Sequence, residues 1–360
     1  MKRIESLDIF RGICAILVMF IHIRVSGTVT ELPISRNAYA FVDFFFILSG
    51  FVIAMKYTNT STTFKNYITT RFFRIYPLFF VLMTVSVVNE SLKYIANTKL
   101  GIEFGASPFT GGSSPEFIPY YYTLTQAWLP WVKSNGFLYP SWSISIEFYM
   151  YIVLWVLISH RYFKASTVIF LLASLSIAII NHRESYPNDV MRGMICIPLG
   201  ALAFYIKDYI KKMPYMEIPM IIACYFAVTQ EYSFKFIGVS ISFFITIIIF
   251  SHDSGVISKV IINRFMKYLG KLSYSIYLSH SIVLYFFVLI SIIIGKVLGL
   301  NFSHYEGSSR IIDFGNVIFN NIFILLALIS TICVSHITNK YIEAPFMKLA
   351  KRNKLKAVTE

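Results

Sequence analysis

The chain has 360 residues, of which 56% are hydrophobic, 17% aromatic and only 14% charged. Soluble domains carry about 25% charged residues, and a mean hydropathy of +0.65 leaves more apolar surface than one aqueous core can bury. The formal net charge is +14. The basic residues separate long apolar segments instead of forming a polar surface, which excludes a nucleic-acid-binding protein. The composition predicts an integral membrane protein.

Four cysteines lie within apolar segments, at Cys14, Cys196, Cys224 and Cys333. They form no CxxC pair and have no metal-ligand spacing, so we expect neither disulfides nor a metal site. The first apolar segment lacks the cleavage site of a signal peptide, and no linker indicates an appended soluble domain. We expect one membrane domain over 1–340, followed by a short basic cytoplasmic tail over 341–360.

Ten segments are predicted as transmembrane helices, because a helix needs about 20 apolar residues to cross about 30 Å of hydrocarbon. The fold is therefore predicted to be all-α, a polytopic transmembrane helical bundle with both termini on one side of the membrane. The segments are about 8–27, 39–57, 75–94, 141–158, 166–181, 191–206, 216–230, 236–251, 272–294 and 314–337.

The distribution of basic residues orients this bundle, because cytoplasmic loops carry an excess of Lys and Arg. The side that holds the N-terminus carries 22 of the 32 Lys and Arg residues, so both termini are predicted to be cytoplasmic. The longest loop, about 95–140, then lies outside and is rich in Gly, Pro, Tyr and Trp. It is either an ordered lid or carbohydrate-stacking surface, or the ordinary aromatic belt of a membrane interface.

The first predicted span contains two ionisable residues, Arg11 and His22, and such groups are costly within a membrane and usually functional. They are eleven residues apart, so at about 100° per residue they lie within about 20° of one helix face, roughly 16 Å apart along the axis. Arg11 is then near the cytoplasmic end and His22 in the outer half. Because imidazole can take up a proton near neutral pH, His22 is predicted to be catalytic.

Two carboxylates are predicted at a depth similar to that of His22. Asp43 lies in FVDFFFILSGF and Glu147 in SWSISIEF, each near the outer end of its span. Either carboxylate could orient the imidazole and stabilise its protonated form, so both are candidate catalytic residues, and the sequence does not choose between them. The alternative is a structural pairing with Arg24 or Arg36.

A cationic cluster is predicted on the cytoplasmic side. Arg71 and Arg74 in RFFRIYP are three residues apart and therefore neighbours on one helix surface. Their planar guanidinium groups suit phosphate oxygens, so with Arg11 they are candidate cofactor-binding residues. The alternative is ordinary positive-inside anchoring. On the same side, Glu343 and Lys340 are predicted to form a structural pair.

Two further groups of polar residues complete the candidate site. Trp142 and Ser143 begin the segment SWSISIEF and are candidate substrate-binding residues. In LGKLSYSIYLSH, the spacing of Ser273, Tyr277 and His280 places them on one face of the inner half of the ninth predicted span. His280 could line a ligand channel, and is a candidate cofactor-binding residue, or it could hydrogen-bond a neighbouring helix.

Taken in order, these segments resemble acyltransferase family 3, the bacterial membrane O-acyltransferases, over essentially the whole chain. The resemblance rests on Arg11 followed by His22, on DFFFILSGF beginning at Asp43, and on RFFRIYP. It also rests on WSISIE ending at Glu147, on LGKLSYSIYLSH and on the terminal IEAPF. The resemblance implies that Arg11, His22, Arg71 and Arg74 are required for activity.

The resemblance further implies an inner-membrane enzyme that moves an acyl group, usually acetyl, from cytoplasmic acetyl-CoA to a hydroxyl of an extracytoplasmic carbohydrate. Acceptors in the family include O-antigen of lipopolysaccharide, capsule and exopolysaccharide. We expect the three arginines to hold the phosphates of acyl-CoA and His22 to act as general base. Direct transfer is favoured, although Ser49 or Ser143 leaves a covalent intermediate open. The expected partners are acyl-CoA, the carbohydrate and membrane lipid, and not nucleic acid.

The alternative function is a transporter or flippase for polysaccharide intermediates. Such a protein typically has internal repeats and interrupted helices that meet at the membrane midplane. No repeat between the two halves of the chain is evident, and the ionisable residues divide into an inner and an outer group. The sequence therefore favours the acyltransferase.

Overall fold

The computed structural model describes residues 4–58, 60, 62–101, 107–160, 162–181, 187–307 and 309–350. The chain is 76% helical, and in the described part a helix of 13 or more residues lies at each of the ten segments predicted from hydropathy. These helices are α1 (Glu5–Ile21), α3 (Phe41–Tyr57), α4 (Phe64–Leu100), α6 (Ser141–Ser159), α7 (Phe163–Asn181), α8 (Asp189–Ile206), α9 (Glu217–Thr229), α10 (Lys235–Phe250), α12 (Arg264–Leu298) and α13 (Val317–Thr338).

Shorter elements occupy the connections. A π-helical turn follows α13 at Asn339–Glu343, and the helical conformation then continues to Ala350. The beginning of the predicted tail thus extends the last helix, while residues 351–360 lie outside the described part. The other short elements are α2 (Pro33–Arg36), α5 (Ile118–Tyr122), α11 (Val256–Ile261) and the 3₁₀ turns Val29–Glu31, Ala38–Ala40, Gly111–Ser113, Pro115–Phe117 and Pro214–Met216.

Six helical stretches in the described residues are long and apolar enough to cross a membrane: Ala38–Tyr57, Phe64–Lys99, Ser141–Ser159, Asp189–Ile206, Arg264–Leu298 and Val317–Ala350. Three more are apolar but shorter, and α1 carries Glu5, Asp8 and Arg11 in its first turns. The helical membrane fold is confirmed, whereas the predicted number of ten spans is not.

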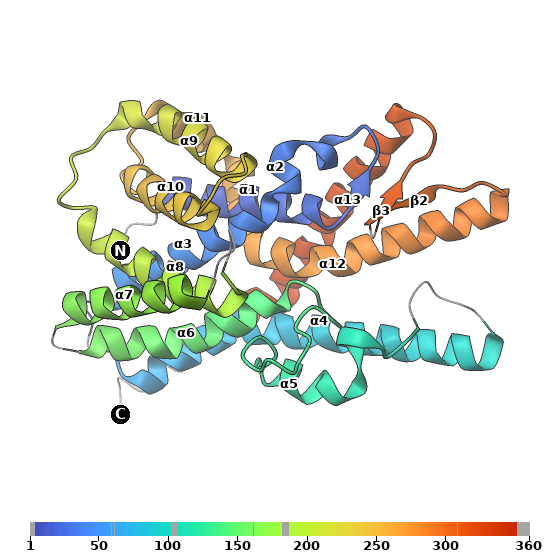
Figure 1. Ribbon diagram of the computed structural model, residues 1–360, viewed down its shortest axis with the longest axis horizontal. Coiled ribbons are helices and arrows are strands. Elements are labelled where there is room, and N and C mark those ends of the chain that lie inside the picture. Colours follow the sequence, from blue (N-terminus) through green and yellow to red (C-terminus); the bar gives the residue numbers. More distant parts are fainter. Residues whose placement is uncertain are drawn as a thin grey trace.

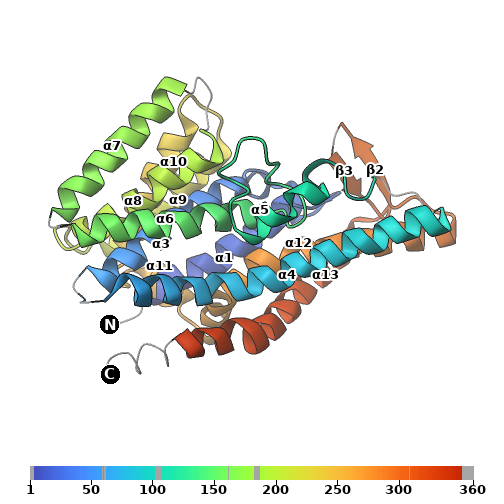
Figure 2. The same ribbon diagram turned by 90° about the horizontal axis from the view of Figure 1, so that it is seen from below.

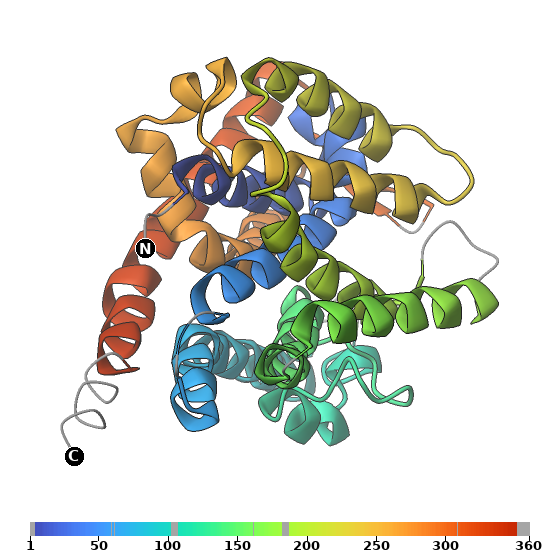
Figure 3. The ribbon, with the colours of Figure 1, turned by 90° about the vertical axis from the view of Figure 1, so that its left-hand side faces the viewer.

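Both termini lie at the same end of the molecule (Figure 1), which Figure 3 shows face on. This agrees with an even number of crossings. The assignment of that end to the cytoplasm stays a prediction. Several basic residues that contribute to it lie outside the described residues, namely Lys2, Arg3, Arg161, Arg183 and those after position 350.

Two helices are much longer than predicted, and they run along most of the molecule (Figures 1 and 2). The 37 residues of α4 and the 35 residues of α12 span about 56 and 53 Å, against about 30 Å of hydrocarbon. Hydropathy detects only the apolar middle of such helices, whereas side-chain caps begin them earlier. Thr63 accepts a hydrogen bond from the Asn66 N–H, and Asn263 accepts one from the Met266 N–H.

Three short strands form a small sheet that the sequence does not predict. It lies toward the end of the molecule opposite the termini (Figure 1). The strand β3 (Ser309–Ile312) lies in the middle, parallel to β1 (Arg24–Val25) and antiparallel to β2 (Ser303–Glu306). In the register, Arg24 is opposite Ile311 and Ser303 is opposite Ile312.

The first span, predicted over 8–27, is wrong at its outer end. The helix α1 ends at Ile21, and His22 is the residue that caps it. Beyond it the polar residues have partners in the sheet, since Nη2 of Arg24 lies 2.9 Å from Oε2 of Glu306. His22 is therefore at the junction between α1 and the outer loops, and its side chain need not follow the helix face of Arg11.

Glycines let α3 and α8 pack with their backbones in contact. A Cβ atom on Gly50 would lie 1.8 Å from the carbonyl oxygen of Ile197, and one on Gly200 would lie 1.7 Å from that of Ile47. Small residues at helix interfaces are typical of membrane bundles because they allow such close approach. The α3 helix of this pair lines the cavity described below.

A second glycine pair joins α1 to α12. A Cβ atom on Gly12 would lie 2.7 Å from the carbonyl carbon of Leu269, and one on Gly270 would lie 2.4 Å from the carbonyl oxygen of Asp8. The close approach fixes the helix that bears Arg11 against the helix that bears the polar residues of LGKLSYSIYLSH.

Candidate functional site

A cavity of about 850 Å³ lies between α1, α3, α4, α6, α12 and the C-terminal helical extension. Its lining runs from Ile4 and Ala350, at the end that holds both termini, to Ser143 and Tyr277 deep in the bundle. Six basic and three acidic side chains line it, so cations are in excess. They are Arg11, Lys56, Arg71, Arg74, Lys271 and Lys348, against Asp8, Glu147 and Glu343.

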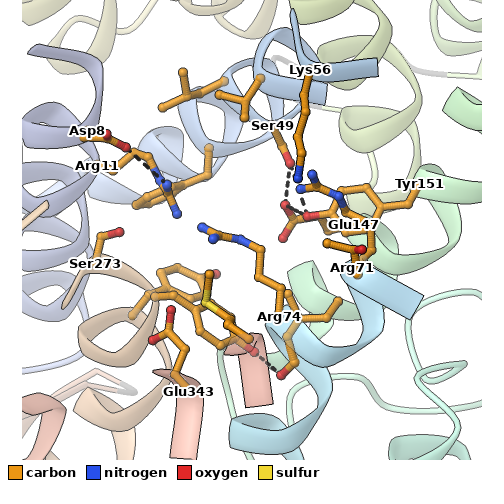
Figure 4. A pocket seen from close by; sticks show the side chains of 18 of the residues that line it. Asp8, Arg11, Ser49, Lys56, Arg71, Arg74, Glu147, Tyr151, Ser273 and Glu343 are labelled. Atoms are coloured by element: carbon orange, nitrogen blue, oxygen red, sulfur yellow. Dashed lines mark hydrogen bonds and ion pairs between the residues drawn. The ribbon is translucent and has the colours of Figure 1, made fainter. Parts of the chain in front are cut away.

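Arg11, Arg71 and Arg74, predicted as a cationic cluster, line this one cavity. Arg71 is 6% exposed, and its guanidinium carbon lies 5.3 Å from the ring centroid of Tyr57. Arg11 forms an ion pair with Asp8 at 3.6 Å. Arg74 makes no hydrogen bond or ion pair with any described residue, and Figure 4 shows its guanidinium group pointing toward the middle of the cavity. The cluster therefore offers donors for an anion.

Glu147 lies in this cavity among the arginines (Figure 4) and not beside His22. Its Oε1 accepts hydrogen bonds from the hydroxyls of Ser49 and Tyr151, both at 2.5 Å. The predicted common depth of Glu147 and His22 is wrong because α6 begins at Ser141 near the middle of the molecule (Figure 1), so that six residues carry Glu147 toward the termini.

A second carboxylate enters the cavity from the π-helical turn, a feature frequent at functional sites. Glu343 is 4% exposed, and its Oε2 accepts hydrogen bonds from Ser275 and Asn339, both at 2.9 Å. The predicted pair with Lys340 is wrong, since the Lys340 ammonium group lies over the ring of Tyr341 at 5.1 Å. The extra residue of the π turn aims Glu343 inward.

The deep end of the cavity is formed by Ser143 and Tyr277. Their hydroxyl oxygens are 2.7 Å apart, and both lie within hydrogen-bond distance of the carbonyl oxygen of Pro140, at 3.0 and 3.4 Å. The Tyr277 ring also packs against Phe45, with centroids 5.4 Å apart. Ser143, a predicted substrate-binding residue, therefore lines the cavity where it comes nearest to the loop before α6.

His22 lies just beyond this end. Its ring stacks on His280, with centroids 5.0 Å apart and an interplanar angle of 16°, and meets Tyr139 edge to face at 4.6 Å. His280 in turn contacts Tyr277, at a centroid distance of 6.1 Å. His280 lies at the level of His22, and not in the inner half as predicted, because α12 begins at Arg264 and places it about 24 Å along the helix.

One face of α12 thus connects the cavity to His22. Ser273 and Tyr277 line the cavity, and His280, one turn further along, carries the contact to His22. On the other side of His22, Tyr139 is 46% exposed. The imidazole of His22 therefore lies between a buried residue at the end of the cavity and an aromatic ring open to the surroundings.

Asp43 and Trp142 gather around Arg192 of α8. Asp43 is fully buried, and its Oδ1 accepts a hydrogen bond from Nε of Arg192 at 2.8 Å. The Arg192 guanidinium carbon lies 5.2 Å from the Trp142 ring centroid. Among the described residues, His22 makes no hydrogen bond or ion pair with Asp43 or Glu147. The expectation that one of them orients the imidazole is therefore corrected.

Three residues of this region are not singled out by the sequence. Tyr151 could have been found one helical turn after Glu147, where i and i+4 side chains meet. Tyr139 carries only the weak signal of an aromatic loop before SWSISIEF, and Arg192 is one of several basic residues on the predicted outer side. In the described residues, no group of three or more His, Cys, Asp or Glu side chains is arranged to hold a metal ion.

Comparison with protein families matches the sequence of the chain to a known domain. The model of the acyltransferase domain of acyltransferase family 3 matches residues 4–340. The matched segment covers nearly the whole chain and includes both the arginines of the cavity and the pair of histidines beyond it. Neither the curated proteins nor the solved structures contain a match to the chain.

Proposed function

The chain belongs to acyltransferase family 3, and on this premise we propose that it is an O-acetyltransferase of the bacterial inner membrane. It takes an acetyl group from cytoplasmic acetyl-CoA and transfers it to a hydroxyl of an extracytoplasmic polysaccharide or lipid-linked glycan, such as O-antigen, capsule or exopolysaccharide. The family and the long apolar helices support acyl transfer by a membrane protein. Acetyl-CoA as the donor, the glycan as the acceptor and the bacterial inner membrane as the location are our proposal.

The cavity suits the phosphate end of acyl-CoA. Guanidinium groups bind phosphate oxygens through paired, charge-assisted hydrogen bonds, and Arg11, Arg71 and Arg74 line one cavity that opens at the predicted cytoplasmic end. Arg74 and Arg11 point into it with few competing partners (Figure 4). Glu147, bound to Ser49 and Tyr151, offsets part of the positive charge and reduces the repulsion among the arginines.

The thioester, on the flexible arm of the coenzyme, extends along α12 to the deep end of the cavity. There the oxygen of the acceptor hydroxyl forms a bond to the carbonyl carbon while His22 removes the hydroxyl proton as general base. The bond from that carbon to sulfur breaks, and the proton passes from His22 to the leaving thiolate. The products are the sugar ester and free coenzyme A, and no other reactant is needed.

The acceptor arrives from the opposite side. Tyr139 is half exposed and touches the ring of His22, so a sugar placed on the tyrosine ring presents a hydroxyl to the imidazole. In this proposal Asp43 and Trp142 are positioning residues that do not touch the substrates. Their contacts hold Arg192 and the start of α6 in place. Ser143, joined to Tyr277, separates donor and acceptor until both are bound.

The observation that carries the proposal is the continuity from cavity to histidine: Tyr277 lines the cavity and contacts His280, which stacks on His22. A transporter or flippase for polysaccharide intermediates is the alternative. It needs a passage for a sugar, whereas basic side chains outnumber acidic ones in the lining of the cavity, which suits the phosphates of acyl-CoA.

The test is to incubate the purified protein, in lipid nanodiscs, with acetyl-CoA labelled in the acetyl group and with envelope glycans from cells that lack the gene. The proposal predicts loss of the thioester together with label in base-labile esters on the glycan. The acetyltransferase proposal is rejected in favour of transport if the thioester stays intact and the glycan stays unlabelled. In that case mass spectrometry should also find no acetyl groups on glycan from the wild-type strain.

A further inference from the structure

His280 is a polar residue in the bundle for which the mechanism above gives no role beyond contact. Its side chain is fully buried. Nδ1 lies 3.2 Å from the carbonyl oxygen of Ile276, and because a carbonyl oxygen only accepts, Nδ1 carries the ring proton. The neutral ring then presents a lone pair at Nε2, which has no hydrogen-bond partner among the described residues.

Resting on the proposed function, we propose that Nε2 of His280 is a substrate-binding atom of the transfer centre and accepts a hydrogen bond from a substrate donor. Two donors reach this point in the proposed reaction. One is a second hydroxyl of the acceptor, next to the hydroxyl whose proton His22 removes, and the other is an amide N–H of the arm of acyl-CoA. Both present the same chemistry to the lone pair, and the experiment below separates them.

Burial and stacking together support this assignment. Buried polar atoms almost always have a partner, and each exception calls for an explanation. The near-parallel stack with His22 places the lone pair of His280, which lies in the ring plane, away from the His22 ring. Two imidazolium charges 5.0 Å apart would also repel each other. His280 is therefore neutral when His22 takes up a proton, and its Nε2 lone pair stays available.

The purely structural alternative makes opposite predictions. If His280 serves only to fill space beside His22 and Tyr277, then a phenylalanine, which keeps an aromatic ring, is the better replacement. If the lone pair binds substrate, then glutamine, whose side-chain oxygen can accept a hydrogen bond, is the better one. The order of the two variants therefore decides between the alternatives.

We would measure acetyl transfer, acetyl-CoA binding and thermal unfolding for wild type, His280→Gln and His280→Phe. The matched control is His336→Phe, which removes an exposed histidine on α13 that hydrogen-bonds Tyr268. We expect His280→Phe to lose about 10–100-fold in transfer, as for loss of a hydrogen bond at a buried site. His280→Gln should retain most activity, and all variants should unfold no earlier than wild type.

The binding measurement identifies the donor. Weaker acetyl-CoA binding by His280→Phe assigns the bond to the amide of the arm, and unchanged acetyl-CoA binding with slower transfer assigns it to the second hydroxyl of the acceptor. Transfer by His280→Phe equal to wild type, or better than by His280→Gln, would overturn the inference. If wild type transfers no acetyl group, the proposed function fails separately. A loss of transfer that accompanies a lower unfolding temperature in both His280→Phe and His280→Gln would also overturn the inference, because the histidine would then act through the stability of the bundle.

Discussion

Replacing Arg74 with glutamine tests the phosphate site with little structural side effect. The Arg74 side chain makes no hydrogen bond or ion pair with a described residue, and it points into a cavity that holds an excess of cations (Figure 4). Removing its charge breaks no hydrogen bond or ion pair within the described residues and relieves repulsion from Arg11. We therefore expect the unfolding temperature of Arg74→Gln, measured without acetyl-CoA, to equal or exceed that of wild type.

The expected loss lies in binding. Hydrogen bonds to a charged group contribute about 1.5–3 kcal/mol, and each 1.4 kcal/mol is about tenfold in Kd. Arg74→Gln should thus bind acetyl-CoA about 10–150-fold more weakly. Arg71→Gln should lose stability as well as binding, because its buried guanidinium group packs on Tyr57.

Isothermal titration calorimetry of nanodisc-embedded protein measures both variants against wild type. The matched control is Arg310→Gln, which removes an arginine that bonds to Tyr305 in the outer sheet. The control should bind acetyl-CoA as wild type does. An unchanged Kd for Arg74→Gln would show that Arg74 does not bind the phosphates of acetyl-CoA. If Arg310→Gln weakened binding as much as Arg74→Gln, the loss of affinity would come from the lower net charge and not from a specific phosphate site.

Three further predictions concern the deep end and the bundle. Tyr139→Ala should raise the acceptor concentration needed for half-maximal transfer several-fold, while Tyr139→Phe should not, as initial rates against glycan concentration will show. Tyr277→Phe removes the 2.7 Å bond to Ser143 and should slow transfer about 5–10-fold at unchanged acetyl-CoA affinity, measured by single-turnover kinetics. Gly200→Val should lower the unfolding temperature by more than about 5 °C, because a Cβ at this position lies 1.7 Å from the backbone oxygen of Ile47. Differential scanning fluorimetry measures that shift, and an unfolding temperature equal to that of wild type would contradict the close packing.

The helices and the cationic cluster could be predicted because both depend on local patterns. Apolar segments of sufficient length define the helices, and a spacing of three residues places Arg71 and Arg74 on one surface wherever the backbone is helical. The structure confirms that both arginines and Arg11 line one cavity. The lengths of α4 and α12 could not be predicted in the same way, because hydropathy does not mark their first turns, which begin at the caps Thr63 and Asn263.

The partners of the ionisable residues could not be predicted, because they come from distant parts of the chain. Asp43 pairs with Arg192, 149 positions away, and His22 stacks on His280. Such pairings depend on which helix faces meet, and the glycine contacts that decide this, such as Gly12 against α12, carry no distinguishing pattern in a single sequence. The depth of Glu147 relative to His22 could not be predicted either, because α6 begins well inside the molecule (Figure 1).

Whether His22 is the general base is tested by single-turnover acetyl transfer by His22→Ala at saturating acetyl-CoA, with acetyl-CoA binding measured on the same preparation. We expect transfer to fall by at least about 100-fold, as for loss of a general base, while the Kd for acetyl-CoA stays within about twofold because the arginines are untouched. His304→Ala, on the exposed strand β2, should behave as wild type in both measurements. Transfer by His22→Ala at the wild-type rate would show that His22 is not the general base.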